Sequence, residues 1–157
     1  MSSSSNKSFN MKKLYIPPTL IAYSILIMII LYLYAPQFNL IGFPYNLSGI
    51  LIAFSGFILM GHARDLFIKH QTTLEIEKSN CMITEGVFSK TRNPMYTGMI
   101  ILIFGFSIFS TNVLAMFLPL VFMTIVRLVF IKREEQLMLE TFGKDYLEYK
   151  KRVRRWI

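Results

Sequence analysis

The sequence lacks charged side chains over two long stretches. Neither Lys, Arg, Asp nor Glu occurs in residues 14–61 or in residues 93–126, which are 48 and 34 residues long. A helix on the surface of a soluble core presents polar residues along one face, and neither stretch has such a face. Because a bilayer core about 30 Å thick needs roughly 20 apolar residues per helix, each stretch is long enough to cross a membrane twice. The pattern excludes an ordinary soluble domain.

Cysteine, histidine and acidic residues are also scarce. One Cys cannot form an internal disulfide, and a total of two His argues against a metal site. Lys and Arg number 17 against 9 Asp and Glu, a net charge of +8. These basic residues border the apolar stretches, so we assign them to anionic membrane lipids and expect no nucleic acid partner.

Turn-forming residues divide each apolar stretch in two. Pro36, Asn39 and Pro44 interrupt the first, and Ser110-Thr111-Asn112 interrupts the second. We therefore expect an all-α membrane protein of about four transmembrane helices, followed by a C-terminal amphipathic interfacial helix. The expected segments are a disordered N-terminus (1–13), a single membrane domain (14–157), spans near 16–35, 46–62, 94–109 and 113–131, a loop (63–93) and a tail (132–157).

Lys and Arg predict the orientation of these spans. Three precede the first span, five lie between the second and third spans, and eight follow the fourth. The two connections on the other side carry none of them. By the positive-inside rule, both termini and the central loop are expected in the cytoplasm. A prokaryotic inner membrane is the expected location.

The first polar stretch that could form a binding or catalytic site precedes the third span. Pro94 suits the first position of a helix, and Asn93 or Thr91 suits its cap. Free backbone N–H groups at this helix end, with Arg92 beside them, form a natural site for a carboxylate or a phosphate. Tyr96, one turn later, is placed to line it. The alternative is a simple helix start whose Arg92 reaches lipid headgroups.

The second polar stretch contains adjacent carboxylates, Glu134 and Glu135, at the expected inner end of the fourth span. Acidic groups are disfavoured at a helix C-terminus, so a positively charged ligand would explain them. Ion pairing with neighbouring Lys or Arg is the alternative. Beyond them an apolar stripe indicates the amphipathic helix, which Gly143 ends or kinks; its members are Met138, Phe142, Tyr146, Tyr149 and Val153.

These motifs, in this order, resemble the isoprenylcysteine carboxyl methyltransferase and phospholipid methyltransferase superfamily of membrane enzymes. The resemblance extends from about Thr84 to Val153, nearly half of the chain. Asn93 departs from the eukaryotic carboxyl methyltransferases, which have His there, so no His acid–base role carries over. The matching elements are Thr84-Glu85-Gly86-Val87-Phe88, Arg92-Asn93-Pro94-Met95-Tyr96-Thr97-Gly98, Glu134-Glu135 and Phe142-Gly143-Lys144-Asp145-Tyr146-Leu147-Glu148-Tyr149.

The resemblance implies methyl transfer from S-adenosylmethionine to a lipophilic small molecule or lipid. It leaves open whether the acceptor is a carboxyl, an amine or a hydroxyl group, and it does not give the oligomeric state. Arg92 and Glu135 are implied as the catalytic pair. The implied cofactor-binding residues are Thr84, Gly86, Asn93, Pro94, Tyr96, Gly98, Glu134 and Glu135.

Two other functions stay open on the sequence alone. Related membrane reductases share a similar C-terminal pattern and use NADPH, although this loop offers only Lys90 and Arg92 for its phosphates. A non-enzymatic membrane scaffold of the same fold is the other alternative. Ligand-induced thermal stabilisation distinguishes a binder from a scaffold.

Overall fold

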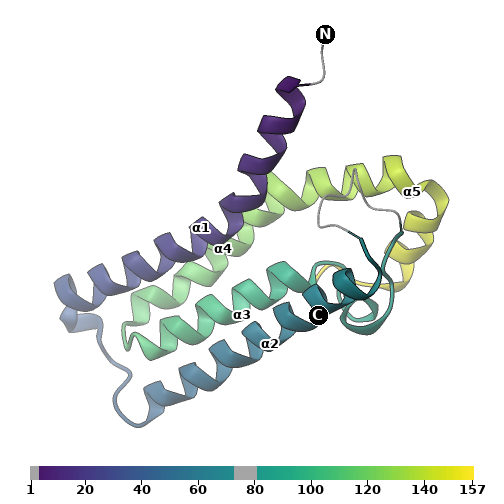
Figure 1. Cartoon of the computed structure of the whole chain (residues 1–157). Helices are drawn as coiled ribbons and strands as arrows, with labels where there is room; N and C mark the ends of the chain where they lie inside the picture. Colours follow the sequence, from purple (N-terminus) through teal and green to yellow (C-terminus); the bar gives the residue numbers. More distant parts are fainter. Residues whose placement is uncertain (1–3, 73–80) are drawn as a thin grey trace.

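The computed structural model describes residues 4–72 and 81–157, and these residues form helices and short connections without strands (Figure 1). The long helices lie side by side as a bundle, and the last one turns away from it at one end. The elements are α1 (Ser4–Tyr34), η1 (Pro36–Phe38), η2 (Tyr45–Leu47), α2 (Ser48–Lys69), η4 (Gly86–Ser89), α3 (Pro94–Phe109), η5 (Val113–Phe117), α4 (Leu118–Ile125), η6 (Val126–Ile131) and α5 (Lys132–Arg152).

The helices confirm the predicted all-α membrane protein. Three helical stretches are long and apolar enough to cross a bilayer: Pro17–Tyr34, Tyr45–Lys69 and Val113–Arg152. The fourth apolar helix, α3, is shorter at 16 residues, as the sequence predicted. Large apolar side chains on the helix surfaces are exposed, including Leu51 at 73% and Phe54 at 60%. Such faces suit contact with lipid tails.

Two helix boundaries differ from the prediction. α1 begins at Ser4 instead of near residue 16, so the helix already includes most of the N-terminal segment expected to be disordered. Pro17 and Pro18 lie inside α1, where each removes one backbone donor without ending the helix. α2 continues to Lys69 because charge ends a membrane span but does not end a helix. Residues 73–80 of the predicted central loop lie outside the described residues.

α4, η6 and α5 follow one another without an intervening loop, and η6 is a π-helix. Glu134 and Glu135 therefore lie in the first turn of α5 and not at a helix C-terminus, so that part of the prediction was wrong. The chain bends at Gly143, which has φ 52° and ψ −119°. A left-handed φ favours glycine, and the predicted kink is confirmed.

α2 and α3 pack against each other through glycines. A Cβ added to Gly105 would lie 2.3 Å from Ala53 N and 2.5 Å from Gly49 O. A Cβ on Gly56 would lie 2.5 Å from Gly98 O. Since these obstacles are backbone atoms, only glycine permits the approach, as is common between membrane helices. The pairing fixes the start of α3 relative to α2.

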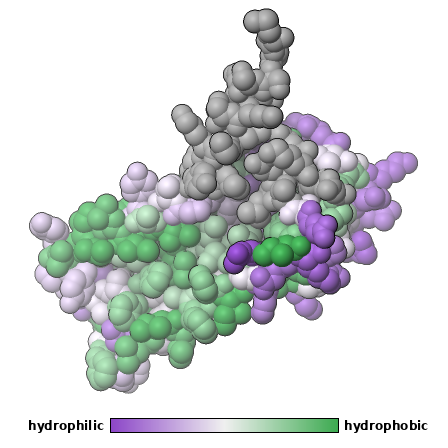
Figure 2. All heavy atoms as spheres, in the orientation of Figure 1, coloured by the Kyte–Doolittle hydropathy of each residue, from purple (hydrophilic) through white to green (hydrophobic). Residues whose placement is uncertain are grey.

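The far end of the bundle is held by a buried amide. Asn112 is fully buried, and its Nδ2 donates to Leu31 O and Ala35 O at 3.1 Å each and to Asn39 Oδ1 at 2.8 Å. Its Oδ1 accepts from Leu114 N at 3.0 Å. One side chain thus joins the α1–α2 connection to the α3–α4 connection. The opposite end gathers the hydrophilic residues around α5 (Figure 2).

Candidate active site

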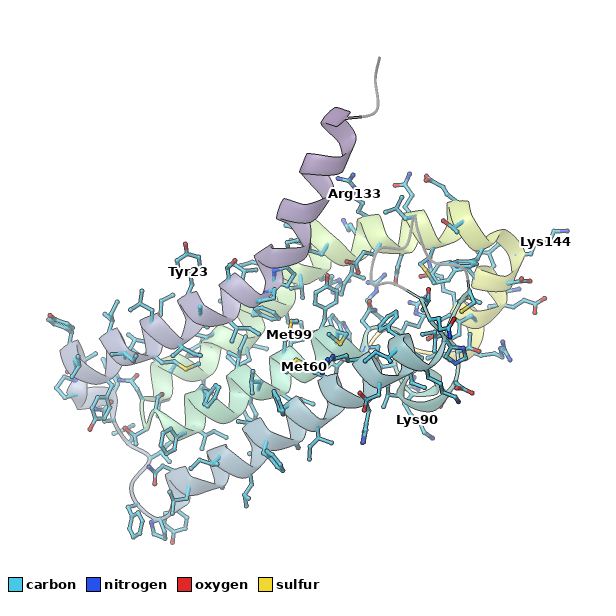
Figure 3. All side chains as sticks on the ribbon, viewed as in Figure 1. Tyr23, Met60, Lys90, Met99, Arg133 and Lys144 are labelled. Atoms are coloured by element: carbon cyan, nitrogen blue, oxygen red, sulfur yellow. The ribbon has the colours of Figure 1, made fainter. Side chains whose placement is uncertain are left out.

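The site forms at the hydrophilic end of the bundle, where α3 begins. Figure 3 shows Lys90, Arg133 and Lys144 at this end, whereas Tyr23 projects from α1 toward the surroundings. Ahead of α3, the η4 segment is attached to α5 because Tyr149 Oη donates to Phe88 O at 2.7 Å. The residues between η4 and α3 therefore have a fixed support.

The C-terminal segment returns to the start of α3. Arg92 N donates to Arg154 O at 2.9 Å, and Thr91 Oγ1 donates to Arg155 O at 2.8 Å. Asn93 Nδ2 also points to Arg155 O, at 3.4 Å. Asn93 occupies the predicted cap position, but its side chain does not cap the helix. The sequence placed this C-terminal segment at the membrane surface; the structure places it against the site.

Arg92 and Glu135, predicted as a catalytic pair, are in contact. Arg92 Nη2 lies 3.1 Å from Glu135 Oε1, and the two side chains are only 8% and 12% exposed. Arg155 binds the same carboxylate through two nitrogens: Nε donates to Oε1 at 2.9 Å and Nη2 to Oε2 at 2.7 Å. Lys150 Nζ is 3.8 Å from Oε2. One carboxylate thus organises three cations.

The cations hold Glu135 in its ionised form. Glu135 lies in α5, the charged part of the Val113–Arg152 stretch, where 11 of 21 residues are charged, and nine residues after the uncharged stretch ends at Val126. Burial would raise the pKa of Glu135, but the hydrogen bond from Arg155 and the charges of Arg92, Arg155 and Lys150 together hold that pKa below its ordinary value. Because the Glu135 carboxylate is paired with three cations, it is better suited to positioning Arg92 than to accepting a proton.

Arg92 retains unused hydrogen-bonding capacity. Its Nε and Nη1 are buried and have no hydrogen-bond partner, and among the described residues only Asn46 Oδ1 shares that condition. Buried donors without partners are rare in folded proteins and costly, most of all on a charged group. These two nitrogens are therefore the strongest sign that an anionic ligand belongs beside Arg92.

Tyr96 and Glu134 form the second predicted contact between α3 and α5. Tyr96 Oη donates to Glu134 Oε1 at 2.8 Å, and the Tyr96 ring packs on Phe130 with centroids 6.5 Å apart. The π-helix η6 immediately precedes these glutamates, and π-helical turns are frequent at functional sites. Glu134 thus contacts Tyr96, whereas Glu135 contacts Arg92 and Arg155.

Two other predicted cofactor residues, Gly98 and Gly86, face α2. Gly98 is part of the α2–α3 contact, since a Cβ there would lie 2.5 Å from Met60 Cγ. Gly86, at φ 58°, opens η4 and lies against Leu66 of α2, while Thr84 is exposed just before it. The described contacts do not bring them to the glutamates. Pro94 is buried as the first residue of α3.

Arg155 and Lys150 are site residues that sequence reasoning missed. Both belong to the basic cluster near the C-terminus, which the sequence assigned to lipid. No helical spacing relates residue 155 to residue 135, because the chain bends at Gly143 between them. The one available signal was Glu135 itself, since a carboxylate that becomes largely enclosed on folding requires cationic partners.

Comparison with known proteins places this geometry in context. A family model described as phospholipid methyltransferase matches residues 39–145. The chain is 30% identical over 87 residues to protein-S-isoprenylcysteine O-methyltransferase B of Arabidopsis thaliana, covering 54% of this chain but 43% of that protein. It is also 30% identical over 63 residues to an uncharacterized protein of Haemophilus influenzae, covering 40% of this chain and 100% of that protein. No solved structure matches the chain.

Proposed function

Because this chain belongs to the phospholipid methyltransferase family, we propose that it transfers a methyl group from S-adenosylmethionine to a lipophilic acceptor. The observation that carries the proposal is the pair of buried, unpartnered nitrogens on Arg92, which contacts Glu135, while Glu134 precedes Glu135 in α5 and contacts Tyr96. A ligand with one anionic and one cationic group suits such a site. The methionine end of the cofactor has a carboxylate and an ammonium group.

Individual residues are assigned by charge. Arg92 Nε and Nη1, together with the N-terminus of α3, suit the carboxylate. Glu134, oriented by Tyr96, suits the ammonium group. Asn93 lies at the start of the same helix and completes the cofactor contacts. Glu135 then acts by holding Arg92.

The other predicted cofactor residues take supporting roles. We assign Gly98 and Pro94 to the placement of α3, and Thr84 and Gly86 to the loop that leads to it. When bound, S-adenosylmethionine supplies an electrophilic methyl group on a sulfonium sulfur, and its transfer leaves S-adenosylhomocysteine. The protein's own contribution is alignment of the two reactants and exclusion of water, which together account for much of the acceleration of such displacements.

The acceptor reaches the site from the bilayer in this proposal. The site lies at the end of apolar helices whose exposed faces suit lipid. The uneven distribution of Lys and Arg supports a cytoplasmic position for this end. A lipophilic acceptor with a polar group at the interface therefore fits the location.

A methyl-transfer assay tests the proposal. Purified protein in vesicles receives S-adenosylmethionine labelled on its methyl group, with phosphatidylethanolamine or N-acetyl-S-farnesylcysteine as acceptor. We expect label in the lipid-soluble fraction and a loss of at least tenfold in Glu134→Gln, which weakens the ammonium contact. Glu148→Gln, on the exposed part of α5, is the matched control. Equal transfer by wild type and Glu134→Gln would contradict the assignment of Glu134.

A further inference from the structure

Arg155 contacts the site through both its main chain and its side chain. Its carbonyl oxygen accepts hydrogen bonds from Thr91 Oγ1 at 2.8 Å and from Asn93 Nδ2 at 3.4 Å. Thr91 and Asn93 are the residues on either side of Arg92. Its guanidinium binds Glu135, the carboxylate that also holds Arg92. Arg92 is therefore enclosed by groups that Arg155 positions.

The guanidinium of Arg155 has no equivalent replacement at this carboxylate. It makes a two-point contact at 2.9 and 2.7 Å, a geometry that a planar guanidinium provides and an ammonium group does not. Lys150 lies farther away, at 3.8 Å from Oε2, and its side chain is 46% exposed. Without Arg155, Glu135 would have one close partner left, Arg92.

We propose that Arg155 is a positioning residue for the methyl donor: by saturating Glu135, it leaves Nε and Nη1 of Arg92 directed at the ligand. This inference rests on the proposed function. In its absence, Glu135 would draw the Arg92 guanidinium into a two-point contact of its own and consume donors that the ligand requires. Arg155 also holds the C-terminal segment against Thr91 and Asn93, which keeps the backbone around Arg92 in place.

Calorimetric titration with S-adenosylhomocysteine tests this role in the full chain, in detergent. Arg155→Gln is expected to raise Kd by about 10- to 100-fold, by analogy with the loss found when partners that orient metal-binding side chains are removed. Arg155→Lys should recover part of the loss through its charge. Arg152→Gln, an exposed arginine at the end of α5, should leave Kd within about twofold of wild type. The fitted stoichiometry reports the folded fraction separately from Kd.

A double variant shows whether Arg155 acts through Glu135. If it does, Glu135→Gln combined with Arg155→Gln should bind no more weakly than Glu135→Gln alone, because contacting residues are non-additive. Wild-type affinity in Arg155→Gln, or additive losses in the double variant, would overturn the inference while leaving the proposed function intact. A wild type that does not bind S-adenosylhomocysteine would overturn the proposed function itself, and this inference with it.

Discussion

Asn112 and Arg92 are polar residues with enclosed side chains, one at each end of the bundle, and they differ in how their hydrogen bonds are satisfied. Asn112 uses its amide nitrogen and its amide oxygen within the protein, and so links two connections. Arg92 is nearly as buried, but two of its three nitrogens have no partner.

This difference indicates a structural role for Asn112 and a ligand-binding role for Arg92. A buried polar group that is fully paired stabilises one arrangement of the chain, and it needs no ligand to explain it. A buried guanidinium with unused donors is costly in the ligand-free protein. A ligand that accepts hydrogen bonds from these donors therefore gains binding free energy. Variants at the two ends should therefore affect different measurements.

The largest expected effect is on ligand binding at Arg92. Arg92→Ala should weaken S-adenosylhomocysteine binding by roughly 100-fold or more, since each hydrogen bond to a charged group contributes about 1.5–3 kcal/mol. Glu135 keeps Arg155 and Lys150, so the fold should persist. Lys90→Ala, exposed in the preceding loop, is the control for lost charge. If Arg92→Ala bound S-adenosylhomocysteine as tightly as wild type, the end of the bundle at Arg92 would not be the ligand-binding end.

The helix contact that positions the site is tested next. Gly105→Ala should lower Tm by roughly 2–12 °C, because overpacking costs about 1–3 kcal/mol and the obstacles are backbone atoms. Gly61→Ala is the matched control in α2, where an added Cβ meets nothing within 4 Å. Thermal unfolding followed by circular dichroism measures both. If the two variants melted together, the close α2–α3 approach would be wrong.

Asn112→Ala should affect stability without affecting the ligand. It leaves Leu31 O and Ala35 O without this donor, at a cost of about 1–3 kcal/mol. The expected result is a Tm lower by a few degrees with Kd for S-adenosylhomocysteine unchanged. A Kd that rose as much as in Arg92→Ala would mean that the two ends are coupled.

The smallest expected effect is the pH dependence of Glu135. Because its folded-state pKa is below the ordinary value, its contribution to stability is fully present above about pH 4.3 and is lost as pH falls through the folded-state pKa. The Tm difference between wild type and Glu135→Gln should therefore stay constant from pH 8 to about pH 5 and shrink below about pH 4. If the Tm difference shrank near pH 7, the folded-state pKa of Glu135 would be raised instead of lowered, and this account of Glu135 would be wrong.

Much of the molecule was predictable from local sequence signals. Uncharged stretches, turn residues and the start of α3 at Pro94 follow from composition and spacing, and the predicted methyltransferase family is confirmed by the match over residues 39–145. Gly143 was predicted as a kink because few other residues suit such a position. The family resemblance implied that Arg92, Tyr96 and the two glutamates share one site, and the structure joins Arg92 to Glu135 and Tyr96 to Glu134.

What could not be predicted depends on long-range packing. The glycines of α2 and α3 give no sign of partnership until the two helices are placed together. Arg155 was indistinguishable from its basic neighbours, since only the bend at Gly143 brings it back to Glu135. The position of the glutamates within a helix was missed because the charge at Lys132 was taken to end the helix as well as the span.

The most direct test of the account is a calorimetric titration of the wild-type protein in detergent with S-adenosylhomocysteine, with NADPH in a parallel cell. We predict saturable binding of S-adenosylhomocysteine at one site per chain and no heat from NADPH beyond dilution. Binding of NADPH alone would contradict the account and indicate a reductase, and the absence of binding by both would indicate a scaffold.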